Sequence, residues 1–173
     1  MKDGKKITAS REESTSYMNQ TLPMRESFDL IQRDLMIGER MASFYFINGL
    51  NKDDDMLKLM DALLKIKKED MPAGILQFME MAIPYTEVAL IEDFDQVLKN
   101  LFSGVTCLFV DGYEGAIAID CRTYPARSVE EPDKDKSLRG SRDGFVETVV
   151  SNTAMIRRRI RSEHLVMEMQ EVG

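Results

Sequence analysis

Strand-length runs of apolar residues are spread along the chain from about residue 41 onward. Residues 41–47 (MASFYFI) are apolar at both sets of alternating positions and are followed by Asn48 and Gly49. This pattern predicts a strand that is buried on both faces. Residues 86–91 (TEVALI) predict a second strand. The segments VTCLFVDG and GAIAIDCR enclose a glycine-containing turn at residues 111–115, and together they predict a β-hairpin.

Segments with helical periodicity lie between these strands. Residues 53–64 begin with three aspartates, and Asp53 is a suitable N-cap for a helix whose acidic first turn complements the helix dipole. Three consecutive carboxylates diverge from one another, so a helix start is favoured over a metal site. Residues 74–83 and residues 92–104, with Gly104 as C-cap, predict two more helices. The apolar stripe expected for the first of these helices is Met56, Leu57, Met60, Leu63 and Leu64.

The order of the predicted elements is strand, helix, helix, strand, helix, strand, strand, long loop and helix, which is typical of an α/β domain. Strands separated by helices favour parallel neighbours with right-handed crossovers. We therefore expect a mixed, mostly parallel sheet of about four strands, with a C-terminal hairpin and helices packed on it. Residues 1–24 show no hydrophobic period and are expected to form a flexible tail. Residues 25–173 are then the soluble domain, and residues 28–38 (FDLIQRDLMIG) form a short amphipathic segment within it.

The composition narrows the possible functions. The formal net charge of −7 and a pI near 4.9 argue against nucleic-acid binding, because the summed field of the protein repels phosphate. Cys107 and Cys121 lack a CxxC spacing and are expected to be reduced and buried. The single histidine, His164, cannot build a metal site alone. Motifs for phosphate binding, metalloprotease activity or a catalytic nucleophile were not found, nor was an apolar run long enough to cross a bilayer. We expect neither enzymatic activity nor a cofactor or metal.

A polar loop and a final helix follow the predicted hairpin. Residues 124–143 (YPARSVEEPDKDKSLRGSRD) predict a loop whose length is typical of functional or partly disordered segments. The helical period returns at Gly144, and Asp143 or Ser141 is a suitable N-cap. Asn152 interrupts the apolar stripe of this helix and needs a hydrogen-bond partner if it is buried. The stripe expected to pack on the sheet is Phe145, Val149, Asn152, Ile156 and Ile160.

Charged residues of this loop and helix are the candidate contacts for a partner protein or an anion. They are Arg127, Glu130, Glu131, Arg139, Arg142, Arg157, Arg158, Arg159 and Arg161. The four arginines in the last turns of the helix complement the negative end of its dipole and are expected to be solvated. The two that precede the helix have three possible roles. They pair with the loop glutamates, bind a phosphate-like ligand at the helix N-terminus, or belong to an interface.

Three blocks of sequence, in this order, resemble the N-terminal soluble domain of spore germinant receptor A subunits, the GerA family. They are FINGLNKD (46–53), LFSGVTCLFVDGYEGAIAIDCRTYPARSVEEP (101–132) and RGSRDGFVETVVSNTAMIRRRIRS (139–162). The resemblance extends over residues 36–162, and the last block is highly specific. One position departs from the family pattern, since Ser141 stands where the family usually has proline.

The resemblance implies that the chain is a fragment of a longer membrane receptor subunit. It implies a location at the spore inner membrane, with this domain on the cytoplasmic (core) side and the membrane contacted only through other parts of the subunit. The implied partners are the receptor B and C subunits, with self-association as a further possibility. Two functions remain open: a module for receptor assembly and signal relay, or a domain that binds a small nutrient molecule or anion.

Overall fold

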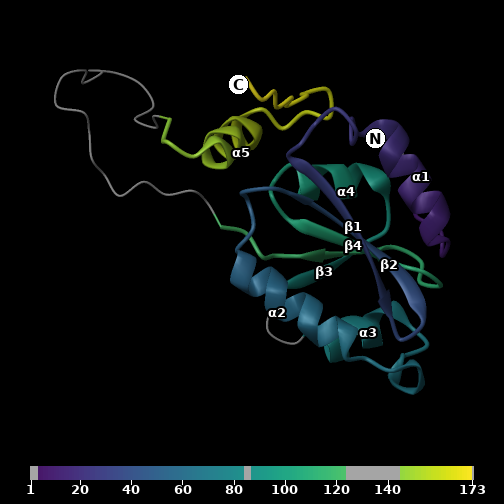
Figure 1. Ribbon diagram of the computed structural model, residues 1–173. Coiled ribbons are helices and arrows are strands. Elements are labelled where there is room, and N and C mark those ends of the chain that lie inside the picture. The colour runs from purple at the N-terminus through teal and green to yellow at the C-terminus, as the bar shows by residue number, and fades with distance from the viewer. Residues whose placement is uncertain (1–3, 84–86, 124–144, 173) are drawn as a thin grey trace.

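The computed structural model describes residues 4–83, 87–123 and 145–172. At its centre is a five-stranded sheet with the strand order β1-β2-β4-β5-β3, shown in Figure 1. All four neighbouring pairs of strands are antiparallel. The strands are β1 (Leu30–Ile37), β2 (Arg40–Ile47), β3 (Val88–Ile91), β4 (Thr106–Val110) and β5 (Ala116–Ile119).

The α/β class is therefore correct, but the expectation of a mostly parallel sheet of about four strands is wrong. Residues 28–38 contain strand β1, which forms a hairpin with β2 through a two-residue turn at Gly38 and Glu39. Both turn residues have positive φ values, 52° and 68°, as a tight hairpin requires. Strand β3 lies at the opposite edge of the sheet from β1 and runs antiparallel to β5. Strand direction depends on such long-range pairings, which local patterns do not encode.

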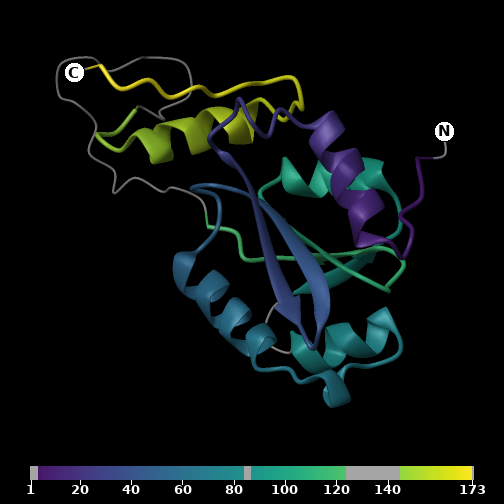
Figure 2. The same cartoon turned by 45° about the vertical axis from the view of Figure 1, so that its right-hand side comes forward.

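Helices cover both faces of the sheet, as the two views in Figures 1 and 2 show. Helices α1 (Arg11–Thr21) and α4 (Phe94–Leu101) lie on one face, and α2 (Asp53–Leu64) and α3 (Ile75–Ala82) lie on the other. A short 3₁₀ turn, η1 (Lys68–Asp70), precedes α3. Helix α5 (Val149–Arg159) lies beyond one end of the sheet, close to the start of β1.

The alternation of side chains along the strands divides the core into two clusters. Tyr45 and Phe109 point to the α1/α4 face, where their rings meet edge to face at 5.7 Å. Phe44 and Leu108, the neighbouring residues, point to the α2/α3 face. Burying a side chain of this size stabilises the fold by about 1.5–3 kcal/mol. The prediction that β2 is buried on both faces is therefore confirmed.

The expectation of a flexible N-terminal tail is wrong for residues 11–21, which form helix α1. Ser10 caps this helix by accepting a hydrogen bond from the Glu13 amide at 3.2 Å. Met18 is fully buried against the sheet and accounts for the docking of the helix. The sequence contained the signal, because Ser-x-x-Glu at residues 10–13 is the pattern of a capping box.

The other predicted elements are confirmed, with local differences. Helix α2 begins at Asp53, but Lys52 occupies the N-cap position, and its buried side chains include Leu59. Leu57 and Leu64, both expected in the apolar stripe, are exposed. The hairpin of β4 and β5, the helix α4 and the positive φ of Gly104 agree with the sequence. The two cysteines, Cys107 and Cys121, are free and buried as expected. Burial raises the pKa of the Cys107 thiol to about 12.

Candidate functional site around helix α5

Helix α5 packs against the domain through a face that differs from the predicted one. Ala154 and Arg157 are its buried residues, whereas Val149 and Ile160 are 56% and 48% exposed. The expectation that the stripe from Phe145 to Ile160 packs on the sheet is therefore wrong. The helix instead turns Ala154 and Arg157 toward the domain. The alanine is small enough for the available space, and the arginine is accommodated because its donors are paired.

Close approach of α5 to the loop after β2 depends on Gly49. Its φ is +83°, a left-handed conformation that glycine adopts readily. A Cβ atom at this position would lie 2.9 Å from Val150 Cγ1 and 3.1 Å from Ala154 Cβ. The absence of a side chain at Gly49 therefore allows α5 to rest directly on the backbone of this loop.

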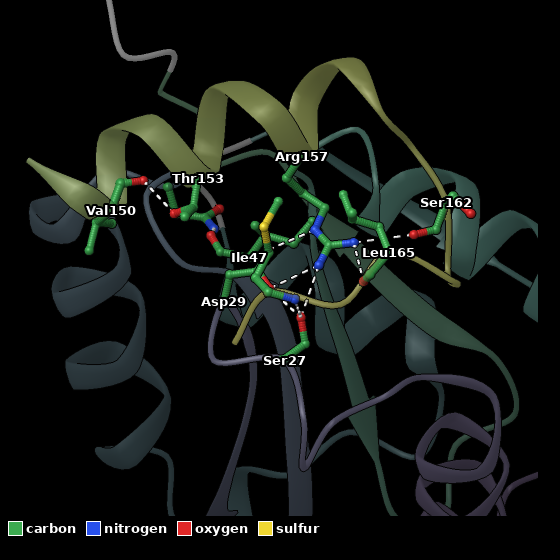
Figure 3. Close-up of polar contacts among 10 residues, drawn as sticks. Ser27, Asp29, Ile47, Val150, Thr153, Arg157, Ser162 and Leu165 are labelled. Atoms are coloured by element: carbon green, nitrogen blue, oxygen red, sulfur yellow. Dashed lines mark hydrogen bonds and ion pairs between the residues drawn. The ribbon is translucent and has the colours of Figure 1, made fainter. Parts of the chain in front are cut away.

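Arg157 is the centre of the site, and its side chain is fully buried. Its Nε donates to Asp29 Oδ2 at 2.7 Å, and its Nη2 donates to Asp29 Oδ1 at 2.9 Å and to Ser27 Oγ at 3.0 Å. Asp29, also fully buried, directly precedes β1. Figure 3 shows the guanidinium lying between α5 and these two residues. The expectation that Arg157 belongs to a solvated helix end is wrong.

The remaining donors of Arg157 bind the backbone that follows α5. Nη1 donates to the carbonyls of Ser162 and Leu165, at 3.2 and 2.9 Å (Figure 3). Together with Asp29 and Ser27, these carbonyls satisfy all five N–H donors of the guanidinium. A buried charge is costly unless it is paired and hydrogen-bonded. The complete set of acceptors explains how an arginine is accommodated at this depth.

Ser27 links the ion pair to the same C-terminal backbone. Its Oγ donates to Asp29 Oδ1 at 2.7 Å and accepts from the Met167 amide at 2.9 Å. The neighbouring Phe28 amide donates to the Met167 carbonyl at 3.0 Å. We call residues 162–167 the C-terminal segment and Ser27, Asp29 and Arg157 the buried cluster. The buried cluster thus joins β1, α5 and the C-terminal segment.

The other predicted site residues have different positions. Arg158, Arg159 and Arg161 are exposed on and after the last turn of α5, and Arg161 Nε donates to the Arg158 carbonyl at 3.2 Å. The remaining candidates lie outside the described residues, as do the two predicted N-caps, Ser141 and Asp143. Those candidates are Arg127, Glu130, Glu131, Arg139 and Arg142.

Asn152 has the partner that its position required. Its Nδ2 donates to the Val146 carbonyl at 2.6 Å, and its Oδ1 accepts from the Val146 amide at 2.7 Å. These two bonds hold the residues just before α5 against the helix. Thr148, rather than Ser141 or Asp143, occupies the N-cap position.

A groove of about 950 Å³ lies beside the C-terminal segment. Its walls come from the end of α1, the following loop, the start of β1 and the C-terminal segment, which contributes Glu163, His164 and Val166. Arg25 and Gln32 are among the polar residues of the opposite walls. No sequence pattern had indicated this groove, because its walls come from both ends of the chain. Within the described ranges, no group of acidic, histidine or cysteine side chains is arranged to hold a metal ion.

A second arginine–aspartate pair attaches the start of α1 to β1. Arg11 forms an ion pair with Asp34, and its Nε donates to Ser43 Oγ at 2.6 Å. Partial burial acts to raise the pKa of Asp34. Hydrogen bonds from Arg11, Gln32 and Ser43 outweigh this effect and hold the Asp34 pKa below its ordinary value.

The sequence of this chain is similar to those of sporulation and germination proteins. The family described as "Bacillus/Clostridium GerA spore germination protein" matches residues 16–173. Stage V sporulation protein AF of Bacillus subtilis is 38% identical over 159 residues, which cover 91% of this chain and 32% of that protein. Spore germination protein KA of the same species is 30% identical over 151 residues, which cover 85% of this chain and 28% of that protein.

A solved structure has the same fold. It is the crystal structure of the N-terminal domain of the A subunit of the Bacillus megaterium spore germinant receptor GerK3. The TM-score is 0.73 at 20% sequence identity, and the match covers 99% of this chain and 63% of that chain. The chain spans about a third of the length of the curated relatives described above. None of the helices within the described residues is long and apolar enough to span a bilayer.

Proposed function

The chain belongs to the GerA family of spore germination proteins, and we propose that it is the N-terminal part of a longer germinant receptor A subunit. In this proposal residues 25–173 and helix α1 form one non-catalytic module that serves receptor assembly and signal relay during germination. The family match and the likeness to an A-subunit N-terminal domain support the proposal.

The assembly role is supported by the outward surface of α5 and of the residues after it. Val149, at the start of α5, and Ile160, just after its end, are about half exposed, and the exposed Arg158, Arg159 and Arg161 flank Ile160 in the sequence. Arginine is among the residues enriched at protein interfaces and at their hot spots. This surface is therefore the contact that we assign to other receptor subunits.

The partners in this proposal are the B and C subunits of the receptor, with contacts between copies of the A subunit as a second possibility. The full-length protein would lie in the spore inner membrane, which it would contact through parts of the subunit other than this domain. The domain itself would face the cytoplasmic side, the spore core. Nucleic acid has no place in the proposal, because the chain is acidic overall.

The test uses the full-length protein in spores. A variant with Val149→Asp, Arg158→Glu and Arg159→Glu changes the outward surface and leaves Arg157 intact. We expect a lower receptor level or slower germination, while the isolated 173-residue chain still folds and its melting temperature falls by only about 2–4 °C, because two charges at the helix C-terminus are reversed. Leu57→Asp is the matched control, because Leu57 is also exposed but lies on α2. Normal receptor level and normal germination in the triple variant would contradict the proposal.

The groove supports a second function, the binding of a small nutrient molecule or an anion. Its volume of about 950 Å³ suits a small ligand, and its walls carry both acidic and basic side chains. Calorimetric or NMR titration of the chain with amino acids, sugars and inorganic phosphate tests this function. Saturable shifts at Arg25 and Gln32 would support it, and flat responses to all three classes would remove it for this chain.

A further inference from the structure

The C-terminal segment is held in place mainly by its backbone. Residues 162–167 form neither helix nor strand, and none of their side chains is buried. The carbonyls of Ser162 and Leu165 accept from Arg157, and the Met167 backbone bonds with Ser27 and Phe28. Apolar burial, which holds the helices of this domain, contributes little to this segment. Its position therefore depends on a few polar contacts.

These contacts form one unit rather than independent bonds. Asp29 fixes the guanidinium through both of its carboxylate oxygens. The Ser27 hydroxyl bonds with Asp29, with Arg157 and with the Met167 amide. A hydroxyl that serves three partners is polarised by each of them, so the bonds support one another. Loss of any member of the buried cluster weakens the attachment of the whole C-terminal segment.

The same segment is one wall of the groove. Glu163, His164 and Val166 line it from the C-terminal side, opposite the walls formed by α1, the following loop and β1. Movement of the C-terminal segment therefore changes the shape of the groove. The position of the C-terminal segment and the width of the groove therefore change together.

We propose that residues 162–167 act as a latch that the buried cluster holds against the residues preceding β1. When the latch opens, the groove loses a wall and the backbone from residue 160 onward is released, while the sheet and helices α1–α4 remain folded. Opening is local because few apolar contacts must break. Segments held in this way open more readily than the core of a domain. The inference concerns the domain alone and does not depend on the proposed role in germination.

Amide hydrogen exchange measured by NMR on the 173-residue chain tests the latch. In the unmodified chain, the Met167 amide should exchange through a local opening, at least about tenfold faster than the amides of β4. Ser27→Ala keeps the arginine–aspartate pair and removes the acceptor of the Met167 amide. We expect the exchange of the Met167 and Phe28 amides to rise about tenfold, the change expected for the loss of one hydrogen bond.

The matched control is Ser43→Ala, which removes a buried hydroxyl from the other arginine–aspartate pair. It should leave the Met167 amide unchanged. In Ser27→Ala, the amide signals of the groove residues Arg25 and Gln32 should shift, and the Met167 amide should still exchange at least about tenfold faster than the amides of β4. Unchanged exchange at Met167 in Ser27→Ala would overturn the latch. Exchange of the Met167 amide no faster than that of the β4 amides, in either chain, would overturn it as well, since the opening would then be global.

Discussion

Two arginine–aspartate pairs attach the two terminal parts of the chain to the first strand, and they differ in burial. Arg157 and Asp29 are both 0% exposed, and they hold α5 and the C-terminal segment. The side chains of Arg11 and Asp34 are 17% and 41% exposed, and they hold the start of α1. Both pairs join an arginine to an aspartate with a serine beside them, and burial is the largest difference between them.

Because the first pair is buried, the fold tolerates the loss of neither partner alone. The intact pair nevertheless contributes little to the free energy of unfolding. Bringing two charges out of water costs about as much as their attraction returns, but removal of one partner leaves the other charge buried alone. In the second pair the Asp34 carboxylate is in contact with water, although Arg11 is mostly buried, so the loss of Asp34 costs less than the loss of Asp29. The buried pair therefore determines where α5 and the C-terminal segment lie, whereas α1 relies mainly on Met18.

The largest effect is expected for Asp29→Ala. It leaves the Arg157 guanidinium buried without its carboxylate, which should lower the free energy of unfolding by about 3–5 kcal/mol. Chemical denaturation followed by circular dichroism measures the change. Arg158→Ala, a change at the exposed neighbouring residue, should stay within about 0.5 kcal/mol of the unmodified chain. A loss below about 1 kcal/mol for Asp29→Ala would show that the pair is solvated.

An intermediate effect is expected for Gly49→Ala, which tests the docking of α5 without altering either pair. The added Cβ would meet Val150 and Ala154, and the φ of +83° disfavours a side chain. We expect a loss of about 1–3 kcal/mol together with changed chemical shifts throughout α5. Gly74→Ala serves as the control, because a Cβ there has no atom within 4 Å. Equal stability of the two variants would contradict close contact between α5 and the loop after β2.

A smaller effect is expected for Asp34→Asn, which removes the carboxylate charge of the partly exposed pair. At neutral pH the loss should be about 0.2–1 kcal/mol. The Asp34 pKa is held below its ordinary value, so this stabilisation is present above the ordinary pKa range of aspartate. It is lost as the pH falls through the depressed pKa. Melting temperatures of the variant and the unmodified chain should therefore converge in acid, and a constant difference would contradict the assignment.

The smallest effect is expected for Arg159→Gln in the isolated chain. Arg159 is exposed on the last turn of α5, and surface substitutions of this kind change stability by less than about 0.5 kcal/mol. Thermal unfolding of the isolated chain measures it. A loss comparable to that of Asp29→Ala would mean that the exposed arginines also support the fold, and it would weaken their assignment to an interface.

The elements between residues 41 and 119 were largely predictable from the sequence because they depend on local periodicity. Residues 41–47 and the hairpin of β4 and β5 are examples, since their apolar character leaves few alternatives. Strand β1 was missed because polar residues such as Arg33 and Asp34 interrupt an edge strand that is only partly buried. The direction of the strands was missed because it follows from pairings between distant segments.

The buried cluster was beyond sequence reasoning for a related reason. Arg157 and Asp29 are 128 residues apart, and nothing in the run of arginines distinguishes Arg157 from its neighbours. The apolar residues Val149 and Ile160 led to the prediction that their side of α5 is buried, whereas that side is exposed. The alanine at position 154 and the glycine at position 49 decided the orientation, and a small residue gives only a weak signal in a hydrophobic pattern.

Two double-mutant cycles, measured by chemical denaturation under the same conditions, compare the strength of the two arginine–aspartate pairs. One cycle combines Asp29→Asn with Arg157→Met, and the other combines Asp34→Asn with Arg11→Met. We expect a coupling free energy of about 2 kcal/mol or more for the buried pair and about 0.2–1 kcal/mol for the partly exposed pair. Equal couplings, or a larger one for Arg11 and Asp34, would contradict the claim that burial gives the Arg157–Asp29 pair its controlling role.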